Sequence, residues 1–319
     1  MSDKLIEVKN LKKYFHISKT QCLHAVDDVS FTINRGETLG LVGESGCGKS
    51  TIGNLVMRLL KADSGEILYE GEDILKLRGR SSKEMRRKMQ IIFQDPYSSL
   101  NPRKDVRGIL SEGYIVQKLC PKAEIDDRIH ELCKNTGISE DDLQKFPHEL
   151  DGGKRQMVGI ARALSLNPEF IVCDEPVSAL DVSVQARIIN LLMEMQKKFG
   201  FAYLFVSHDL SVVRHISNRI AVMYLGKVAE FCSCDELFSN PLHPYTQELL
   251  SAIPSVDVDH KMERIVLKGD VPSPINPRPG CRFAGRCMYA KDICFQKEPV
   301  YEEKCSGHFV ACHMVEKQP

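Results

Sequence analysis

The chain has 319 residues, of which 43% are hydrophobic and 27% charged, and its formal net charge is +0. This length suits one large core with a smaller appendage or two domains, and the balanced charge gives no general attraction to nucleic acid or anionic lipid. No apolar run reaches the roughly 20 residues that span a bilayer. The N-terminal sequence MSDKLIEVKNLKKYF lacks the apolar core of a signal peptide, so we expect a cytosolic protein that can still dock on a membrane partner.

Strand-like and helix-like segments alternate along the chain. Short β-like runs fill residues 5–35, and the apolar run TLGLVG (38–43) predicts a buried strand that precedes a helix from Lys49 onward. A polar helical region follows at about 105–145. Two more apolar runs, FIVC and FAYLFV, predict buried strands on either side of an amphipathic helix that ends at Gly200. This alternation predicts an α/β architecture with a mainly parallel sheet, and the Pro-rich texture of the C-terminal part places a domain boundary near residue 250.

The turn between the predicted strand and the helix at Lys49 matches G-x-x-x-x-G-K-[ST], the pattern of a phosphate-binding loop. Its glycines let backbone N–H groups face phosphates, the lysine adds a positive charge, and the serine hydroxyl can bind Mg²⁺. The alternative is an ordinary Gly-rich turn, and the predicted strand before the motif and helix after it favour the phosphate-binding loop. The candidate nucleotide-binding residues are Gly43, Glu44, Ser45, Gly46, Cys47, Gly48, Lys49, Ser50 and Thr51.

Carboxylates and a histidine follow two of the other predicted strands. Asp174 closes the strand FIVC and is expected at the carboxyl edge of the sheet, near the Mg²⁺. Glu175 comes next, and a carboxylate beside the γ-phosphate can orient and polarise the attacking water. His208 follows the strand AYLFVS, where its imidazole could contact the γ-phosphate. Each residue could instead cap a turn or a helix, and the phosphate-binding loop in the same chain favours the catalytic interpretation.

The stretch HELDGGKRQMVGIARAL (148–164) holds a second glycine turn that opens a helix. At such a helix start the backbone N–H groups of Gly152 and Gly153 have no carbonyl partner within the helix, so they can bind a phosphate. Asp151 stands directly before them, where its negative charge would repel that phosphate. Two interpretations stay open: an altered phosphate-binding turn, or an ordinary helix that Asp151 caps.

Six motifs, GESGCGKST, IIFQDP, the glycine-turn helix, CDEP, SALD and SHDL, occur in an order that resembles the nucleotide-binding subunit of ABC transporters, over about residues 5–250. The resemblance implies a P-loop NTPase fold, with a RecA-like core, a β-subdomain and a helical subdomain at about 96–165, that hydrolyses ATP with Mg²⁺. It implies that Gln94 links Mg²⁺ and water to the membrane subunit and that Asp181 is the D-loop aspartate. It also implies that Tyr14 stacks on adenine, although an aromatic residue in an N-terminal strand is usually part of the core.

A narrower resemblance covers nearly the whole chain. The segments DPYSSLNPR (95–103) and NPLHPYTQELLSAIP (240–254), together with the tail GCRFAGRC…HFVACH, are similar to the ATPases of oligopeptide, dipeptide and nickel permeases. This implies a nucleotide-binding domain at 1–250 and a Cys-rich C-terminal domain at 251–319. It also implies import of peptides, or of nickel or a metal chelate, from the cytoplasmic face of the membrane. The implied partners are a paralogous ATPase, two transmembrane permease subunits and, indirectly, an extracellular or periplasmic substrate-binding protein, with no nucleic acid.

The tail holds five of the chain's 12 cysteines, which in a cytosolic protein favours metal over disulfides. The narrower resemblance associates four of them with a [4Fe–4S] cluster, in the pattern C-x5-C-x6-C-x17-C. Zn²⁺ would satisfy the same four sulfurs, and nearby His308 and His313 keep it as an alternative. Cys305 has no place in the pattern. The four cysteines are Cys281, Cys287, Cys294 and Cys312.

The glycine turn departs from the family pattern LSGGQ, which closes over the ATP that the opposite subunit of a dimer holds. Here Asp151 replaces the serine and Lys154 the glutamine. Either Asp151 caps its own helix while Lys154 offsets its charge, or the ATP site that this motif completes is weakened. The chain's own ATP would meet intact motifs, so we expect a heterodimer whose partner carries a normal signature. The rival hypotheses are a non-transport ABC ATPase and a metal- or redox-sensing regulator.

Overall fold

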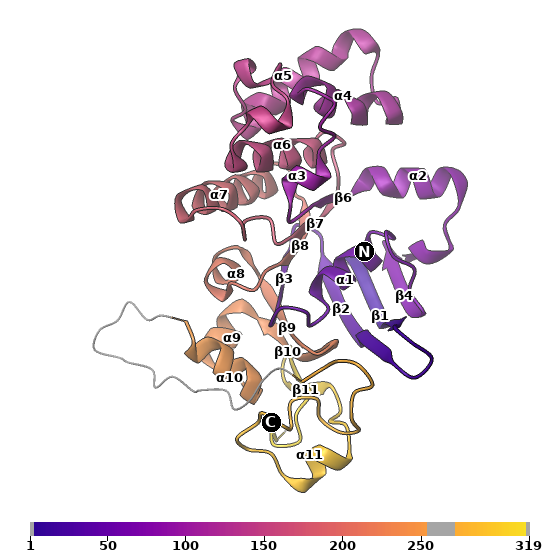
Figure 1. Cartoon of the computed structure of the whole chain (residues 1–319), viewed down its shortest axis with the longest axis vertical. Helices are drawn as coiled ribbons and strands as arrows, with labels where there is room; N and C mark the ends of the chain where they lie inside the picture. Colours follow the sequence, from indigo (N-terminus) through magenta and orange to yellow (C-terminus); the bar gives the residue numbers. More distant parts are fainter. Residues whose placement is uncertain (1–2, 254–271, 317–319) are drawn as a thin grey trace, which may run out of the picture. The chain divides into compact units, whose positions relative to one another are not determined.

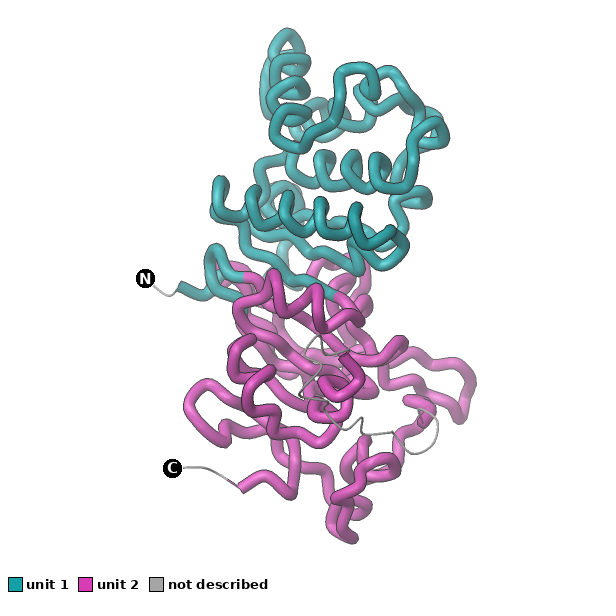
Figure 2. The backbone as a smooth tube through the Cα atoms, turned by 90° about the vertical axis from the view of Figure 1, so that its left-hand side faces the viewer, with its two compact units in different colours: residues 1–5, 33–37, 74–206 teal, residues 6–32, 38–73, 207–319 magenta. Residues whose placement is uncertain are grey.

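The computed structural model describes residues 3–253 and 272–316, which form two compact units interleaved in sequence (Figure 2). Unit 1 comprises residues 1–5, 33–37 and 74–206. Unit 2 comprises residues 6–32, 38–73 and 207–319. None of the helices in the described residues combines the length and the apolar character needed to cross a membrane.

Unit 1 is built on three parallel strands in the order β8–β7–β6, and β7 and β8 are buried along their whole length. Most of its helices lie in the two stretches that connect these strands in sequence, and α4 and α5 pack on α6 and on each other. The strands are β6 (Met89–Ile92), β7 (Phe170–Asp174) and β8 (Ala202–Val206). The helices, seen in Figure 1, are α2 (Gly79–Lys88), α3 (Pro96–Ser99), α4 (Val106–Gln117), α5 (Ile125–Thr136), α6 (Gly152–Leu164) and α7 (Val182–Phe199), with short 3-10 turns at Ile74–Lys76, Lys122–Glu124, Glu140–Asp142 and Pro147–Glu149.

Unit 2 holds a run of strands in the order β11–β12–β10–β9–β3, of which β3 and β9 are parallel and the other neighbours antiparallel. A second sheet, in the order β2–β1–β4–β5, belongs to unit 2 except for the ends of β1 and β2. The strands are β1 (Lys4–His16), β2 (Cys22–Asn34), β3 (Thr38–Val42), β4 (Ser64–Tyr69), β5 (Glu72–Asp73), β9 (Arg219–Tyr224), β10 (Lys227–Ser233), β11 (Glu302–Cys305) and β12 (His308–Val310). The helices are α1 (Lys49–Val56), α8 (Leu210–Ile216), α9 (Cys234–Ser239), α10 (Pro244–Ser251) and α11 (Asp292–Gln296).

The apolar runs of the sequence became β3, β7 and β8, and the amphipathic helix α7 ends at Gly200 with φ 74°, as predicted. The helix that begins at Lys49 is shorter than its apolar pattern. Arg58 adopts φ 55° and the Leu59 N–H donates back to the Asn54 carbonyl at 2.8 Å, a bond that closes a helix end. The boundary expected near residue 250 precedes residues 254–271, which lie outside the described residues.

Candidate nucleotide-binding site

The predicted phosphate-binding loop (43–50) joins β3 to α1 in unit 2, and its glycines are required by geometry. Gly43 and Gly48 have φ 149° and 107°. A Cβ on Gly43 would lie 2.2 Å from the Met223 carbonyl oxygen, and one on Gly48 would lie 2.1 Å from that of Ala25. The loop therefore bends tightly against neighbouring backbone, which leaves the α1 N–H groups without a side-chain cap and available to an anion.

Lys49 is the first residue of α1, and its side chain folds back over the loop. Its ammonium donates to the carbonyls of Gly43 at 2.8 Å and Glu44 at 3.0 Å, and the residue is only 4% exposed. Because the loop carbonyls hold this ammonium group, it lies within the loop, where it can bind phosphate oxygens.

Glu44 anchors the loop to the C-terminal part of unit 2 rather than facing solvent. The Arg286 guanidinium donates to both of its carboxylate oxygens, at 2.7 and 3.0 Å, and is buried against the Tyr224 ring. The backbone N–H of Glu44 donates to the Tyr245 hydroxyl of α10 at 2.9 Å. Bidentate pairs of this kind fix geometry as well as charge, so the tail orients the phosphate-binding loop.

His208 lies near the same end of β3. Its neighbour Ser207 donates its N–H to the Leu41 carbonyl of β3 at 3.2 Å, and Asp209 caps α8 by accepting the Ser211 N–H at 2.8 Å. His208 itself is exposed between these two fixed points. His208 is therefore exposed close to the end of β3 from which the phosphate-binding loop begins.

In unit 1, Gln94 and Glu175 meet at the carboxyl ends of β6 and β7. The Gln94 side-chain amide donates to a Glu175 carboxylate oxygen at 2.9 Å. Parallel pairing of Ile92 with Cys173 brings the two residues together, because each lies two positions after its member of this pair. Glu175 has φ 45°, a left-handed conformation that is costly for a residue with a side chain and is concentrated at functional sites. The preceding Asp174 is 8% exposed at the end of β7.

The glycine turn begins α6, and Asp151 caps this helix. Its carboxylate accepts the Lys154 N–H at 2.8 Å while the side chain remains exposed. The Lys154 ammonium does not offset that charge as expected but pairs with Asp142 at 3.0 Å. Asp181 caps α7 in the same way, accepting the Val184 N–H at 3.0 Å. A cavity of about 600 Å³ is lined by the residues of both caps: Asp151, Gly152, Gly153 and Asp181.

Tyr14 lies on β1 with one face of its ring covered. It stacks on His24 with ring centroids 4.1 Å apart, and its hydroxyl donates to Asp27 at 2.5 Å. Stacking on adenine by Tyr14 therefore stays a prediction that concerns the other ring face. Of the residues expected around the nucleotide, the loop with His208 lies in unit 2, and Gln94, Glu175, Asp174 and the two caps lie in unit 1.

Sequence reasoning missed the partners that hold these residues: Arg286, Tyr245 and Asp142. Arg286 stands between Cys281 and Cys287, as Arg282 also does, and nothing in the sequence singles it out as the partner of Glu44. Nothing in the sequence points from Asp142 or Tyr245 to the residues they contact.

The fold, the phosphate-binding loop and the Gln94–Glu175 pair define an ABC-type ATPase, and comparisons with known proteins agree. A family model described as ABC transporter matches residues 26–178, and one described as oligopeptide/dipeptide transporter, C-terminal region, matches residues 229–294. The solved dimeric, post-hydrolysis structure of the ATP-binding cassette MJ0796 bound to ADP and Pi is similar with a TM-score of 0.66 and 28% identity. It covers 72% of this chain and 98% of that one.

The oligopeptide transport ATP-binding protein AppF of Bacillus subtilis is 50% identical over 319 residues, covering 97% of each chain. OppF of the same organism is 53% identical and covers 85% of this chain and 89% of its own. A putative peptide import ATP-binding protein of Brucella ovis is 48% identical, covering 97% of each chain. The chain belongs to the ATP-binding proteins of the oligopeptide/dipeptide ABC transporter family, whose ligands are ATP and Mg²⁺.

Proposed function

We propose that this chain powers the import of peptides, as a peripheral ATPase subunit on the cytoplasmic face of the membrane. The observation that carries the proposal is the full-length likeness to oligopeptide transport ATP-binding proteins, combined with an intact phosphate-binding loop. ATP-driven closure of a dimer of such subunits would act on two transmembrane permease subunits, which receive peptides from an extracellular or periplasmic binding protein.

The roles of the site residues follow from their chemistry. The phosphate-binding loop (43–50) and Thr51 hold the phosphates, with Lys49 neutralising their charge and the Ser50 hydroxyl and Asp174 binding Mg²⁺. Glu175 orients the attacking water, and its hydrogen bond from Gln94 supports this role because the amide fixes the orientation of the carboxylate. His208 stabilises the γ-phosphate, and Tyr14 stacks on adenine.

We further propose that the working unit is a heterodimer with a paralogous ATPase. Asp151 and Asp181 would face the ATP that the partner holds, and their shared cavity supports this. A carboxylate near a polyphosphate is repulsive: at an effective dielectric constant of about 20, two unit charges 4 Å apart repel by roughly 4 kcal/mol. A homodimer would carry two such altered sites, whereas a partner with a normal signature restores the site on this chain.

We also propose that the four tail cysteines hold a [4Fe–4S] cluster. Burial raises the pKa of Cys281 to about 11, and the nearby thiols of Cys312, Cys294 and Cys287 add to the effect. The Met314 N–H lies 3.4 Å from the Cys312 sulfur, a contact typical of cluster sulfurs. Tetrahedral Zn²⁺ would need sulfurs about 3.8 Å apart, and within the described residues no three of these thiols lie within 4.8 Å of one another. The cluster would supply the cross-link that this core-poor segment needs.

The deciding experiment is peptide uptake by proteoliposomes that contain the permease subunits, both ATPase subunits and the binding protein. We expect this chain to co-purify with the permease and labelled oligopeptide uptake to require ATP. Lys49→Ala should abolish uptake, whereas Lys61→Ala, beyond α1, should not. Failure to co-purify would contradict the transport function, and uptake of nickel in place of peptides would contradict the assigned substrate.

A further inference from the structure

A row of metal-binding residue types crosses three neighbouring strands of unit 2, outside the nucleotide site. β10 and β12 are antiparallel with Glu230 opposite Val310, and the same register places Cys232 opposite His308. On the other side of β12, Cys305 of β11 pairs with His308. Directly opposed residues project from the same face of a sheet. The two thiols therefore flank the imidazole.

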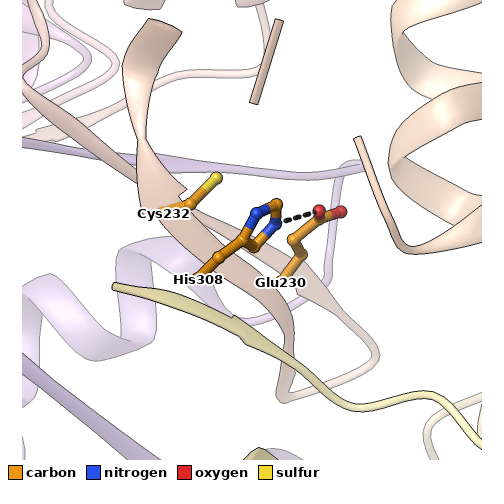
Figure 3. A group of neighbouring side chains, drawn as sticks. All are labelled: Glu230, Cys232 and His308. Carbon is orange, nitrogen blue, oxygen red and sulfur yellow. Dashed lines mark hydrogen bonds and ion pairs between the residues drawn. The ribbon is translucent and has the colours of Figure 1, made fainter. Parts of the chain in front are cut away.

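Glu230 fixes the orientation and the tautomer of this imidazole (Figure 3). The carboxylate is fully buried and accepts backbone N–H groups from Leu242 at 2.7 Å and His243 at 3.0 Å, and Nε2 of His308 at 2.6 Å. Nε2 carries the proton, because a carboxylate only accepts, so Nδ1 presents its lone pair. A carboxylate that holds the second ring nitrogen is the usual companion of a histidine that binds metal.

The other ring nitrogen of His308, Nδ1, is in an unusual environment for a buried polar atom. The residue is 0% exposed, yet Nδ1 has no hydrogen-bond partner within the part of the chain that the structure describes. A carboxylate oxygen of Glu236, on α9, lies 3.7 Å away, too far for a hydrogen bond. The donor atoms of Glu236, Cys305 and His308 all lie within 4.8 Å of one another, as do those of Glu230, Cys232 and His308. Figure 3 shows the Cys232 sulfur on the side of the ring away from Glu230.

We propose that Nδ1 of His308, the sulfurs of Cys232 and Cys305 and a carboxylate oxygen of Glu236 bind one Zn²⁺ ion. Zn²⁺ takes nitrogen, sulfur and oxygen ligands at about 2.0–2.3 Å in a tetrahedron, so its donors stand about 3.3–3.8 Å apart. Within each of the two groups of three donors the separations need only a small contraction, and the two groups meet at the His308 ring, so the ion would draw Cys232 toward Cys305 and Glu236. Thiolates and imidazole select Zn²⁺ over Mg²⁺ and Ca²⁺, which prefer oxygen.

Metal binding would also change the protonation of the Cys232 and Cys305 thiols. Burial raises the pKa of the Cys232 thiol, with Glu230 and Glu236 adding to it, and burial followed by Glu236 raises that of Cys305. Both thiols are protonated at neutral pH without metal. Zn²⁺ forms two Zn–S bonds and releases those two protons to solvent, so its affinity rises with pH.

The site would fasten the β11–β12 hairpin to β10 and α9. β11 has four residues and β12 three, and the pairing of Glu230 with Val310 and of Phe231 with Phe309 holds this hairpin to β10, so a bound metal would add a cross-link. This assigns Cys305, which has no place among the four cluster cysteines, to a second centre with its own metal.

The test is the metal content of the full-length protein, measured by mass spectrometry, followed by Co²⁺ titration of the metal-depleted protein. We expect about one zinc per chain, and Co²⁺ absorption bands of a tetrahedral thiolate site. Cys305→Ser and Glu236→Gln should each weaken Zn²⁺ binding by roughly tenfold or more. Cys120→Ser and Asp235→Asn are the matched controls and should bind Zn²⁺ as the natural protein does.

Cys305→Ser is the deciding variant, because its side chain is partly exposed and the substitution leaves the strand pairing intact. Circular dichroism equal to that of the natural protein verifies its fold. Cys287→Ser separates the two centres: it should lower iron and leave zinc unchanged. The proposal is overturned if zinc is lost in Cys287→Ser but kept in Cys305→Ser, or if the natural protein binds neither Zn²⁺ nor Co²⁺.

Discussion

Glu175 is held in a left-handed conformation, with φ 45°, and one of its carboxylate oxygens is occupied by the Gln94 amide. Such strain persists only where surrounding contacts impose it. We expect Glu175→Gln to lower the ATP turnover number by about 10²–10⁴-fold, the usual contribution of a positioned base, with ATP affinity nearly unchanged. Turnover and nucleotide binding would be measured separately. Glu194→Gln, at an exposed position of α7, is the control. If Glu175→Gln keeps more than half of the turnover, Glu175 is not the base.

Arg286 connects the tail to the phosphate-binding loop through both carboxylate oxygens of Glu44. Lysine cannot form this bidentate pair, although it keeps the charge. Arg286→Lys should therefore loosen the loop and weaken ATP binding severalfold, which is about 1 kcal/mol. Titration with a fluorescent ATP analogue measures the effect against Arg278→Lys, an exposed arginine of the same segment. Equal affinities in the two variants would mean that the Glu44–Arg286 pair does not orient the loop.

At the scale of elements, Asp142 joins the 3-10 turn at Glu140–Asp142 to α6. Burial opposes its charge, but hydrogen bonds from Lys145, Ser139 and Lys154 outweigh it and lower the pKa of Asp142 to about 2. A depressed carboxylate pKa stabilises the fold above the unfolded-state value of about 4, and this stability is lost as the pH falls from about 4 to 2. Asp142→Asn should thus lower the free energy of unfolding by about 2 kcal/mol at pH 7.

Urea unfolding at several pH values measures this effect. The difference between Asp142→Asn and the natural protein should shrink below pH 4 as the aspartate is protonated. Asp141→Asn, its exposed neighbour, should show little change throughout. A deficit of equal size at pH 7 and pH 3 would show that the contribution of Asp142 is not electrostatic.

Elements with a continuous apolar pattern could be predicted from the sequence, and those fixed by distant partners could not. FIVC and AYLFV became β7 and β8 because a buried parallel strand leaves its own signature of uninterrupted apolar residues. β11, with the sequence EEKC, has no such pattern, since its place depends on pairing with β12. The Glu44–Arg286 contact joins residues 242 positions apart, and no local periodicity encodes it.

At the scale of the whole molecule, the caps of α6 and α7 border one cavity, although 30 positions separate Asp151 from Asp181 in the sequence. The structure confirms that Asp151 caps α6, but capping leaves the carboxylate exposed and charged. If the γ-phosphate of the partner's ATP enters this cavity, Asp151 would both cap α6 and repel that phosphate. The altered signature would then limit the partner's site rather than this chain's own.

Asp151→Ser tests this directly, because serine caps a helix about as well as aspartate and carries no charge. In the reconstituted heterodimer we expect ATP turnover to rise by several-fold to tenfold, well below the limit set by the roughly 4 kcal/mol repulsion because the carboxylate is exposed and screened. The partner's site should account for the gain, so it should disappear when the partner's own phosphate-binding lysine is replaced. Asp105→Ser is the matched control: Asp105 caps α4 by accepting the Gly108 N–H at 2.8 Å, the same bond in another helix. Unchanged turnover and ATP affinity in Asp151→Ser would mean that Asp151 acts only as a helix cap. They would contradict the hypothesis that Asp151 weakens the partner's ATP site.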